Sequence, residues 1–294
     1  MSSCLVNRPD TGQHGGALDV RIRWSSDEVP SGAQVWYEGS DDDFRGRAAP
    51  LGGGWPGIVR ADGDAQVIVA LDCRNQKNKA LVVQGDLVSP PQDTRREGTV
   101  ADGLGRVTAE TALKAAGRYG CEASGGGKLT QVRVPDRRTT GSTEPVEKAE
   151  GSCSAVRGLS RQATAAGVPD IMEYPADSRA PQVNCYLLTP GKKPGYGLYA
   201  YYGAVAKDFR VSSYGGGSRF TGKDTAWATA RCPQYAEPAR FALYRLHEPG
   251  TDRDAYSVRA YSADFAEAAL KSFADDEAKR RGCTDVRMVS GPAV

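Results

Sequence analysis

The stretch AKRRGCT, residues 278–284, decides the fold, because it ends a helix-like segment with a glycine followed by a cysteine. The same signature closes an earlier helix-like segment, AGRYGCE, at residues 116–122. A glycine at this place is typical of the left-handed residue that follows the last turn of a helix. The sequence therefore predicts two similar domains, each with a cysteine just beyond its final helix.

The segments that precede these helices also match one another. Residues 71–90, LDCRNQKNKALVVQGDLVSP, align without gaps on residues 230–249, ARCPQYAEPARFALYRLHEP. Each reads as a strand, a cysteine, a polar turn and a second strand. Strands followed by a segregated helix predict an α+β fold, with two tandem copies of a small, mostly antiparallel sheet and its C-terminal helix. We assign the first copy to residues 1–124, a linker to 125–150 and the second copy to 151–294.

Alternating apolar residues predict further elements in each copy. The expected strands are residues 17–24, 33–39, 65–73 and 80–88 in the first copy, and 182–189, 196–206, 225–232 and 239–246 in the second, where the closing helix and the segment TDVRMV, 284–289, follow them. Residues 153–167 suggest a short opening helix, and KLTQVRV, 128–134, is a further strand candidate within the linker. The tyrosines at 196–202 are expected to pack in the core rather than form a carbohydrate-stacking platform.

The pairing of four of the seven cysteines follows directly from the repeat. In each copy one cysteine ends a strand and another follows the last helix, which predicts the disulfides Cys73–Cys121 and Cys232–Cys283. Each bond would tie the final helix to its sheet. Closing a loop of about 50 residues removes unfolded-chain entropy equivalent to roughly 4 kcal/mol of stability.

The other three cysteines lie in the opening part of each copy. Cys153 and Cys185 bracket the first helix and first strand of the second copy and form the third expected pair. Cys4 aligns with Cys153, but Trp36 takes the place of Cys185, so Cys4 is expected to be unpaired. It is a candidate for lipidation, for burial as a free thiol or for a bond to another chain.

Free buried thiols and metal ligands are the alternatives to disulfides. The sequence contains no C-x-x-C motif and only two histidines, His14 and His247, so we expect no metal and no cofactor. Neither histidine lies in a motif of nucleophilic catalysis. Disulfides form in oxidising compartments, and the pattern therefore predicts an extracellular or cell-surface protein.

The overall composition narrows the function classes. The 38 basic and 36 acidic side chains leave a net charge of +2, without the basic block that is typical of nucleic-acid binding. No apolar run reaches the roughly 20 residues that span a bilayer, and the first residues do not resemble a signal peptide. Because the cysteines predict export, we expect a targeting or anchoring segment to have been removed, and any membrane attachment to have depended on it.

Two loops contain candidate binding residues. GSDDDFRG, residues 39–46, includes Asp41 and Asp43, but consecutive carboxylates do not follow the alternation of a calcium loop. GGGWPG, 52–57, places Trp55 either as an exposed anchor for a partner or as a cap on the core. GSRFTGKD, 217–224, has the glycine spacing of a phosphate loop but an aspartate where the magnesium-binding hydroxyl belongs, so it is expected to be a hairpin loop.

The segments ATARCPQ (228–234), AKRRGC (278–283) and AAGRYGCE (115–122), with the high content of Ala, Gly and Arg, resemble the tandem-domain ectodomains of actinobacterial envelope proteins. In that family the cysteine segments follow a cleaved signal or a single membrane helix. The resemblance implies export, secreted or membrane-anchored, and it carries no activity with it.

These observations favour an exported, disulfide-stabilised, non-enzymatic binding or scaffold module whose partner is an envelope protein or a wall polymer. A secreted carboxylate-dependent hydrolase is the first alternative, and it would require polar groups that converge in a deep pocket. A secreted inhibitor or immunity protein is the second, and it would present a rigid loop such as 52–57 to its target.

Overall fold

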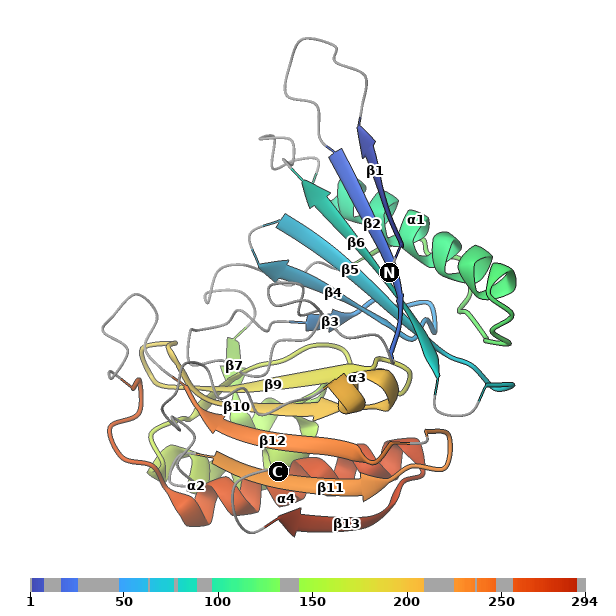
Figure 1. Ribbon diagram of the computed structural model, residues 1–294. Coiled ribbons are helices and arrows are strands. Elements are labelled where there is room, and N and C mark those ends of the chain that lie inside the picture. The colour runs from blue at the N-terminus through green and yellow to red at the C-terminus, as the bar shows by residue number, and fades with distance from the viewer. Residues whose placement is uncertain are drawn as a thin grey trace, which may run out of the picture.

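The protein, seen in a computed structural model, contains two antiparallel sheets and two long helices (Figure 1). The fold is α+β, as the sequence predicts. The structure describes residues 2–7, 17–25, 48–62, 64–76, 79–88, 97–132, 143–208, 225–235, 237–246 and 256–289.

The first sheet has six strands in the order β1-β2-β6-β5-β4-β3, and helix α1 follows it in the chain. The elements are β1 (Ser2–Asn7), β2 (Ala17–Trp24), β3 (Ala48–Pro50), β4 (Gly57–Asp62), β5 (Asp64–Asp72), β6 (Ala80–Val88) and α1 (Glu97–Arg118). The predicted strands at 17–24, 65–73 and 80–88 are confirmed, whereas the one at 33–39 lies outside the described residues.

The second sheet has seven strands in the order β13-β11-β12-β10-β9-β8-β7. Its strands are β7 (Thr143–Pro145), β8 (Asp170–Met172), β9 (Gln182–Leu188), β10 (Pro194–Tyr201), β11 (Thr225–Arg231), β12 (Ala239–Arg245) and β13 (Thr284–Val289). Its helices are α2 (Ser160–Ala165), α3 (Gly203–Asp208) and α4 (Ala263–Arg281), with 3-10 helices at Val146–Lys148 and Ser154–Leu159.

The two sheets share a central topology. In the first, the hairpins β1–β2 and β5–β6 lie side by side through β2 and β6, and α1 follows β6. In the second, the hairpins β9–β10 and β11–β12 meet through β10 and β12, and α4 follows β12. The halves differ at their edges, because β4 and β3 extend the first sheet beyond β5, whereas β13 extends the second sheet beyond β11 and β8 and β7 extend it beyond β9.

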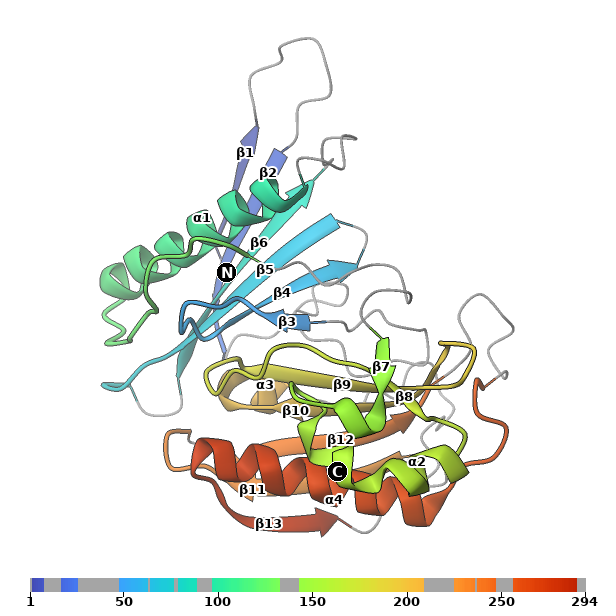
Figure 2. The ribbon, with the colours of Figure 1, turned by 180° about the vertical axis from the view of Figure 1, so that it is seen from behind.

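Each sheet buries both of its faces over part of its width. The outer face of the first sheet packs on α1 in a cluster that includes Val69, Val83 and Leu104, and α4 covers the second sheet in the same way (Figure 2). The inner faces meet in a third cluster, where Ile68 of β5 lies with Tyr199 of β10. The result is four layers, helix, sheet, sheet and helix, with apolar burial as the main stabilising force.

The sheets diverge away from this contact. Strand β3 lies nearest to the second sheet, whereas β1 and β2 lie furthest from it (Figures 1 and 2). The inner face of the first sheet is therefore packed against the second sheet near β3, β4 and β5 and turns away from it toward β2. This divergence positions the candidate site described below.

Both long helices end in the predicted manner. Gly120 and Gly282 each have φ of 65°, in the left-handed region that glycine adopts without strain. The N–H of Cys121 donates to the carbonyl of Ala116 at 2.8 Å, and that of Cys283 donates to Ala278 at 2.8 Å. These are the bonds of a Schellman motif, which places each cysteine directly after the left-handed glycine that ends its helix.

Two predicted strands need correction. The strand expected at 196–206 ends at Tyr201, because Gly203, at φ of 55°, turns the chain into α3. Residues 128–132 of the strand candidate in the linker form no strand. Instead Leu129 and Val132 are buried in the first cluster, so this part of the linker packs on the first half.

Candidate functional site

The disulfides are the covalent frame on which any functional surface is held. The structure contains the three predicted pairs, Cys73–Cys121, Cys153–Cys185 and Cys232–Cys283. Two of them join the end of β5 or β11 to the residue beyond α1 or α4. Three disulfides in one chain are consistent with an extracellular protein that folds in an oxidising environment.

The alignment of Cys4 with Cys153 is wrong. Cys4 lies on β1, which pairs with β2 as β9, the strand of Cys185, pairs with β10. The sheet order thus places Cys4 in the strand equivalent to that of Cys185. Sequence spacing gave the wrong match because Cys153 lies in the segment between β7 and β8, which precedes the hairpin β9–β10, whereas Cys4 lies within the hairpin β1–β2 itself. Trp36 lies outside the described residues.

The structure locates one of the predicted binding residues. Trp55 is 5% exposed, its Nε1–H donates to the carbonyl of Gly127 at 2.7 Å, and a Cβ at Gly126 would collide with its ring. The ring therefore caps the core and offers no exposed anchor. The other candidates, at Asp41 and Asp43, lie outside the described residues, as do His14, His247 and the glycine loop 217–224.

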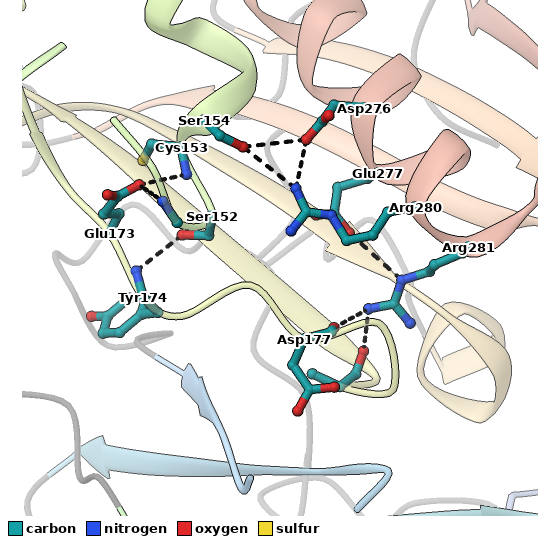
Figure 3. Close-up of polar contacts among 12 residues, drawn as sticks. Ser152, Cys153, Ser154, Glu173, Tyr174, Asp177, Asp276, Glu277, Arg280 and Arg281 are labelled. Carbon is teal, nitrogen blue, oxygen red and sulfur yellow. Dashed lines mark hydrogen bonds and ion pairs between the residues drawn. The ribbon is translucent and has the colours of Figure 1, made fainter. Parts of the chain in front are cut away.

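A buried charged network lies at the C-terminal end of α4 (Figure 3). Glu277 and Arg281, one turn apart, are 1% and 6% exposed, and Arg281 Nε lies 3.6 Å from Glu277 Oε2. The hydroxyl of Tyr202 donates to Glu277 Oε2 at 3.0 Å, and the Arg281 guanidinium lies 3.6 Å from the centre of that ring. Burial, followed by the charge of Glu277, raises the pKa of Tyr202 well above its ordinary value.

This network is connected to the first half of the chain. Arg281 Nη2 donates to the carbonyls of Asp177 and Ala180, which fixes the loop before β9. From the same loop, Arg179 donates to the carbonyl of Ser124 at 3.0 Å and to that of Gly125 at 3.2 Å. The end of α4 therefore helps to hold the two halves together, and its ionic groups have partners within the fold.

Asp72, the last residue of β5, lies at the same junction. Its carboxylate oxygens lie against Gly203, where an added Cβ would be 2.9 Å from Oδ2 and 3.1 Å from the ring of Tyr235. Burial raises the pKa of Asp72 to about 6, and burial also raises the pKa of Tyr235. The residue as a whole nevertheless remains exposed, so solvent screens much of its charge.

A second polar cluster stabilises the opening of the second half (Figure 3). Glu173 accepts hydrogen bonds from the backbone N–H groups of Glu150, Gly151 and Cys153, at 2.8 to 3.0 Å. The hydroxyl of Ser152 donates to the carbonyl of Asn184 at 2.6 Å. The carboxylate fills a concavity of backbone donors that would otherwise attract an external anion, so we assign it a structural role.

The third polar group, which we call the polar strip, lies on the inner face of the first sheet. Its seven residues are cross-strand neighbours of one another or of the apolar inner-face residues: Asp19, Arg21, Arg23, Arg60, Gln66, Gln84 and Asp86. Directly opposed residues of an antiparallel pair point to the same side of a sheet. Where the sheets diverge, the inner face of the first sheet therefore carries the polar strip instead of the apolar residues that contact the second sheet elsewhere.

The polar strip is internally hydrogen-bonded. Gln66 Nε2 donates to Asp86 Oδ1 at 2.5 Å, and Gln84 Nε2 donates to Asp86 Oδ2 at 2.7 Å. Arg21 Nη2 lies 2.7 Å from Asp19 Oδ2. Arg60 Nη1 donates to Gln66 Oε1 at 3.3 Å. These bonds fix the side chains in one arrangement before any ligand arrives.

The strip has a buried part and a partly exposed part. Arg23, Arg60 and Gln84 are 4%, 1% and 8% exposed. Asp19 and Arg21 keep 15% and 38% of their side-chain surface exposed, and Gln66 and Asp86 are half-buried. A polar row with one side fixed in the protein and the other side open to contact is a candidate binding surface, and it is the one that we favour.

Sequence reasoning missed both the strip and the buried pair on α4. The alternation of strand β2, ALDVRIRW, placed Asp19, Arg21 and Arg23 on one face, but that face reads as solvated surface unless the second sheet is known. Glu277 and Arg281 continue the buried stripe of α4 at helical spacing, and this i, i+4 relation to Phe273 was the available signal.

The chain has no significant match among protein-family models, curated proteins or solved structures. Within the described part of the chain, no three His, Cys, Asp or Glu side chains are grouped so as to hold a metal ion. Among the helices of those same residues, none is long and apolar enough to cross a membrane. The function is therefore inferred from the geometry of the chain itself.

Proposed function

We propose that the protein is an exported binding or scaffold module of the bacterial cell envelope, without enzymatic activity, and that the polar strip is its binding surface. The observation that carries the proposal is the set of three disulfides, two of which fasten a terminal helix to its sheet. Such bonds form in oxidising compartments and are rare in the cytosol.

Support for a binding role comes from the rigidity of the strip. Its charged groups are held by hydrogen bonds within the sheet, while Asp19, Arg21, Gln66 and Asp86 keep part of their surface exposed. A surface that is ordered before binding loses little conformational entropy on contact with a ligand. The resemblance to actinobacterial envelope ectodomains supports the same placement.

We further infer that the halves are copies of one ancestral domain. The common order of two hairpins and a helix, with equivalent disulfides, supports this origin. Attachment to the cell surface, through a removed segment or a lipid on Cys4, belongs to the same proposal.

Two measurements on the native protein test this function. Alkylation without a reductant, followed by mass spectrometry, should leave the six paired cysteines unmodified. Co-sedimentation with isolated bacterial envelope fragments should be saturable. Alkylation of all seven thiols would overturn the export, and failure to co-sediment would overturn the envelope-binding role. Release of soluble fragments from the envelope would replace it with the hydrolase alternative.

A further inference from the structure

The polar strip has a regular geometry that suggests the chemistry of its ligand. Arg60, Gln66, Asp86 and Asp19 are successive cross-strand partners on β4, β5, β6 and β2. Neighbouring strands lie about 4.8 Å apart, so these four residues form a straight row across the sheet with one polar group at each step. Gln84 and Arg21 are the corresponding partners in the next row on β6 and β2.

The charges of the strip nearly cancel where it is exposed, and each charged group there has a hydrogen-bond partner. Arg21 is paired with Asp19, and Asp86 accepts hydrogen bonds from both Gln66 and Gln84. A polyanion is attracted by cations in excess, and a polycation by carboxylates in excess. The partly exposed part contains one arginine and two aspartates, which leaves a net charge of about −1 on Asp86, a carboxylate already bonded by two amides, so this part repels polyanions and attracts polycations only weakly.

Hydroxyl groups match this arrangement better than ions do. A hydroxyl donates one hydrogen bond and accepts others, so it can bridge an aspartate oxygen and a guanidinium or amide N–H at the same time. Planar carboxylate and guanidinium groups can also contact two adjacent hydroxyls with two parallel bonds. A surface that offers both kinds of group, the N–H donors of Gln66 and Arg21 beside the carboxylates of Asp86 and Asp19, therefore fits a chain of hydroxyl-bearing units.

An apolar peptide is a poorer match. The large aromatic side chains of the inner faces, such as Tyr199 and Tyr201, are 1% and 0% exposed and already packed within the contact between the sheets. The partly exposed strip residues supply hydrogen bonds and no apolar socket, whereas peptide anchors are buried mainly in such sockets.

We infer that the polar strip binds an uncharged, polyhydroxylated polymer, that is, a neutral glycan, with Asp19, Arg21, Gln66 and Asp86 as the contacting residues. This inference rests on the proposed binding function and specifies its ligand class. Affinity for one polymer unit should be low, since the contacts are exposed hydrogen bonds, and repetition of the units along the row should raise it.

The test uses the full, disulfide-bonded protein and a panel of soluble neutral polysaccharides, namely dextran, mannan and arabinogalactan. Each is paired with its carboxymethylated, anionic derivative. Retardation in affinity electrophoresis should show binding to at least one neutral polymer, and at least fivefold weaker binding to its anionic derivative. Absence of binding to all three neutral polymers, or equal or stronger binding of the derivatives, would overturn the inference.

Variants locate the binding surface. Asp86→Ala should weaken binding at least tenfold, and Asp86→Asn, which keeps the acceptor carbonyl, should weaken it less. Glu110→Ala changes an exposed carboxylate on α1, on the opposite side of the same sheet, and should leave binding unchanged. Equal binding by Asp86→Ala and Glu110→Ala would overturn the inference, provided that thermal unfolding shows both variants to be folded.

The glycan inference and the proposed function can fail separately. If the protein co-sediments with envelope fragments but binds none of the neutral polymers, the envelope role stands and the ligand class is wrong. If Asp19→Ala and Asp86→Ala still co-sediment as the native protein does, the polar strip is not the binding surface. If the native protein binds a neutral polymer but no envelope fragment, the glycan specificity stands and the envelope role is wrong.

Discussion

The two helix ends that share the Gly-Cys signature have the same covalent design and different surroundings. At the end of α1, Asn75 Nδ2 donates to the carbonyl of Gly120 at 2.9 Å. At the end of α4, Gln234 Nε2 donates to the carbonyl of Arg281 at 3.0 Å. In both halves a side-chain amide from the strand turn thus satisfies a carbonyl that the end of the helix leaves unpaired.

The positions just before these ends differ sharply in charge. When the two cysteines are aligned, Glu277 matches Ala115 and Arg281 matches Tyr119. Ala115 is an ordinary core residue and Tyr119 is 38% exposed, whereas Glu277 and Arg281 are buried. The comparison indicates that two halves with the same arrangement of hairpins, helix and disulfide can differ in the side chains at the helix end, and that only the second half places buried charged groups there.

The largest expected effect tests the disulfide that each half forms beyond its long helix. Replacing both members of a staple, as in Cys73→Ser/Cys121→Ser or Cys232→Ser/Cys283→Ser, should lower the free energy of unfolding by roughly 4 kcal/mol, because each loop is of similar length. Urea titration of the two double variants measures the losses. A loss in one variant less than half of that in the other would contradict the equivalence of the two staples.

The next effect tests the buried charged pair, which lies only at the end of α4. Glu277→Ala removes the carboxylate beside Arg281 and leaves a buried cation, which should cost about 3 kcal/mol of unfolding free energy. Tyr119→Ala, at the α1 position that matches Arg281, should cost less than about 1 kcal/mol, since it deletes a partly exposed side chain. Equal losses in thermal unfolding would remove the distinction between the two helix ends.

The covalent part of the fold could be predicted from sequence, because disulfide positions repeat with the strands and helices that they join. Cys232 and Cys283 occupy the same places in their half as Cys73 and Cys121, and no long-range geometry was needed to pair them. The left-handed glycines followed equally from local backbone preference.

What could not be predicted depends on how the two sheets meet. Strand β1, residues 2–7, is short, and β3 contains Pro50, so neither gives a clear alternating pattern. Arg60 reads as a surface residue on an alternating strand, yet the packing of the inner face leaves it 1% exposed. The polar strip exists as a site only once the register of β2, β4, β5 and β6 is known.

A smaller effect tests the connection that only the second half makes. Arg179→Ala removes two hydrogen bonds from a half-buried guanidinium to the backbone of the first half, which should cost about 1 kcal/mol. Arg161→Ala, on the exposed surface of α2, is the matched control and should be neutral. Hydrogen exchange at residues 119–127 should rise only in the Arg179 variant, and a rise in both would contradict the role of this connection.

The smallest effect concerns Asp72, whose counterpart in the second half is Arg231, a side chain that is 78% exposed. Because burial raises the pKa of Asp72 from 3.8 to about 6, the folded protein binds this proton more tightly than the unfolded chain does. The contribution of Asp72 to stability therefore falls as the pH rises from about 4 to about 6 and is constant outside that window. Solvent screening keeps the total below about 1 kcal/mol.

Asp72→Asn should abolish this dependence of the unfolding free energy on pH and leave the contributions of the other carboxylates intact. The quantity to measure is the difference in unfolding free energy between the native protein and the variant, at intervals from pH 4 to pH 7. The native protein should lose stability relative to the variant as the pH rises. A difference that is constant with pH would show that the Asp72 carboxylate is fully solvated. The contact of β5 with Gly203 would then not disfavour the charged form of Asp72.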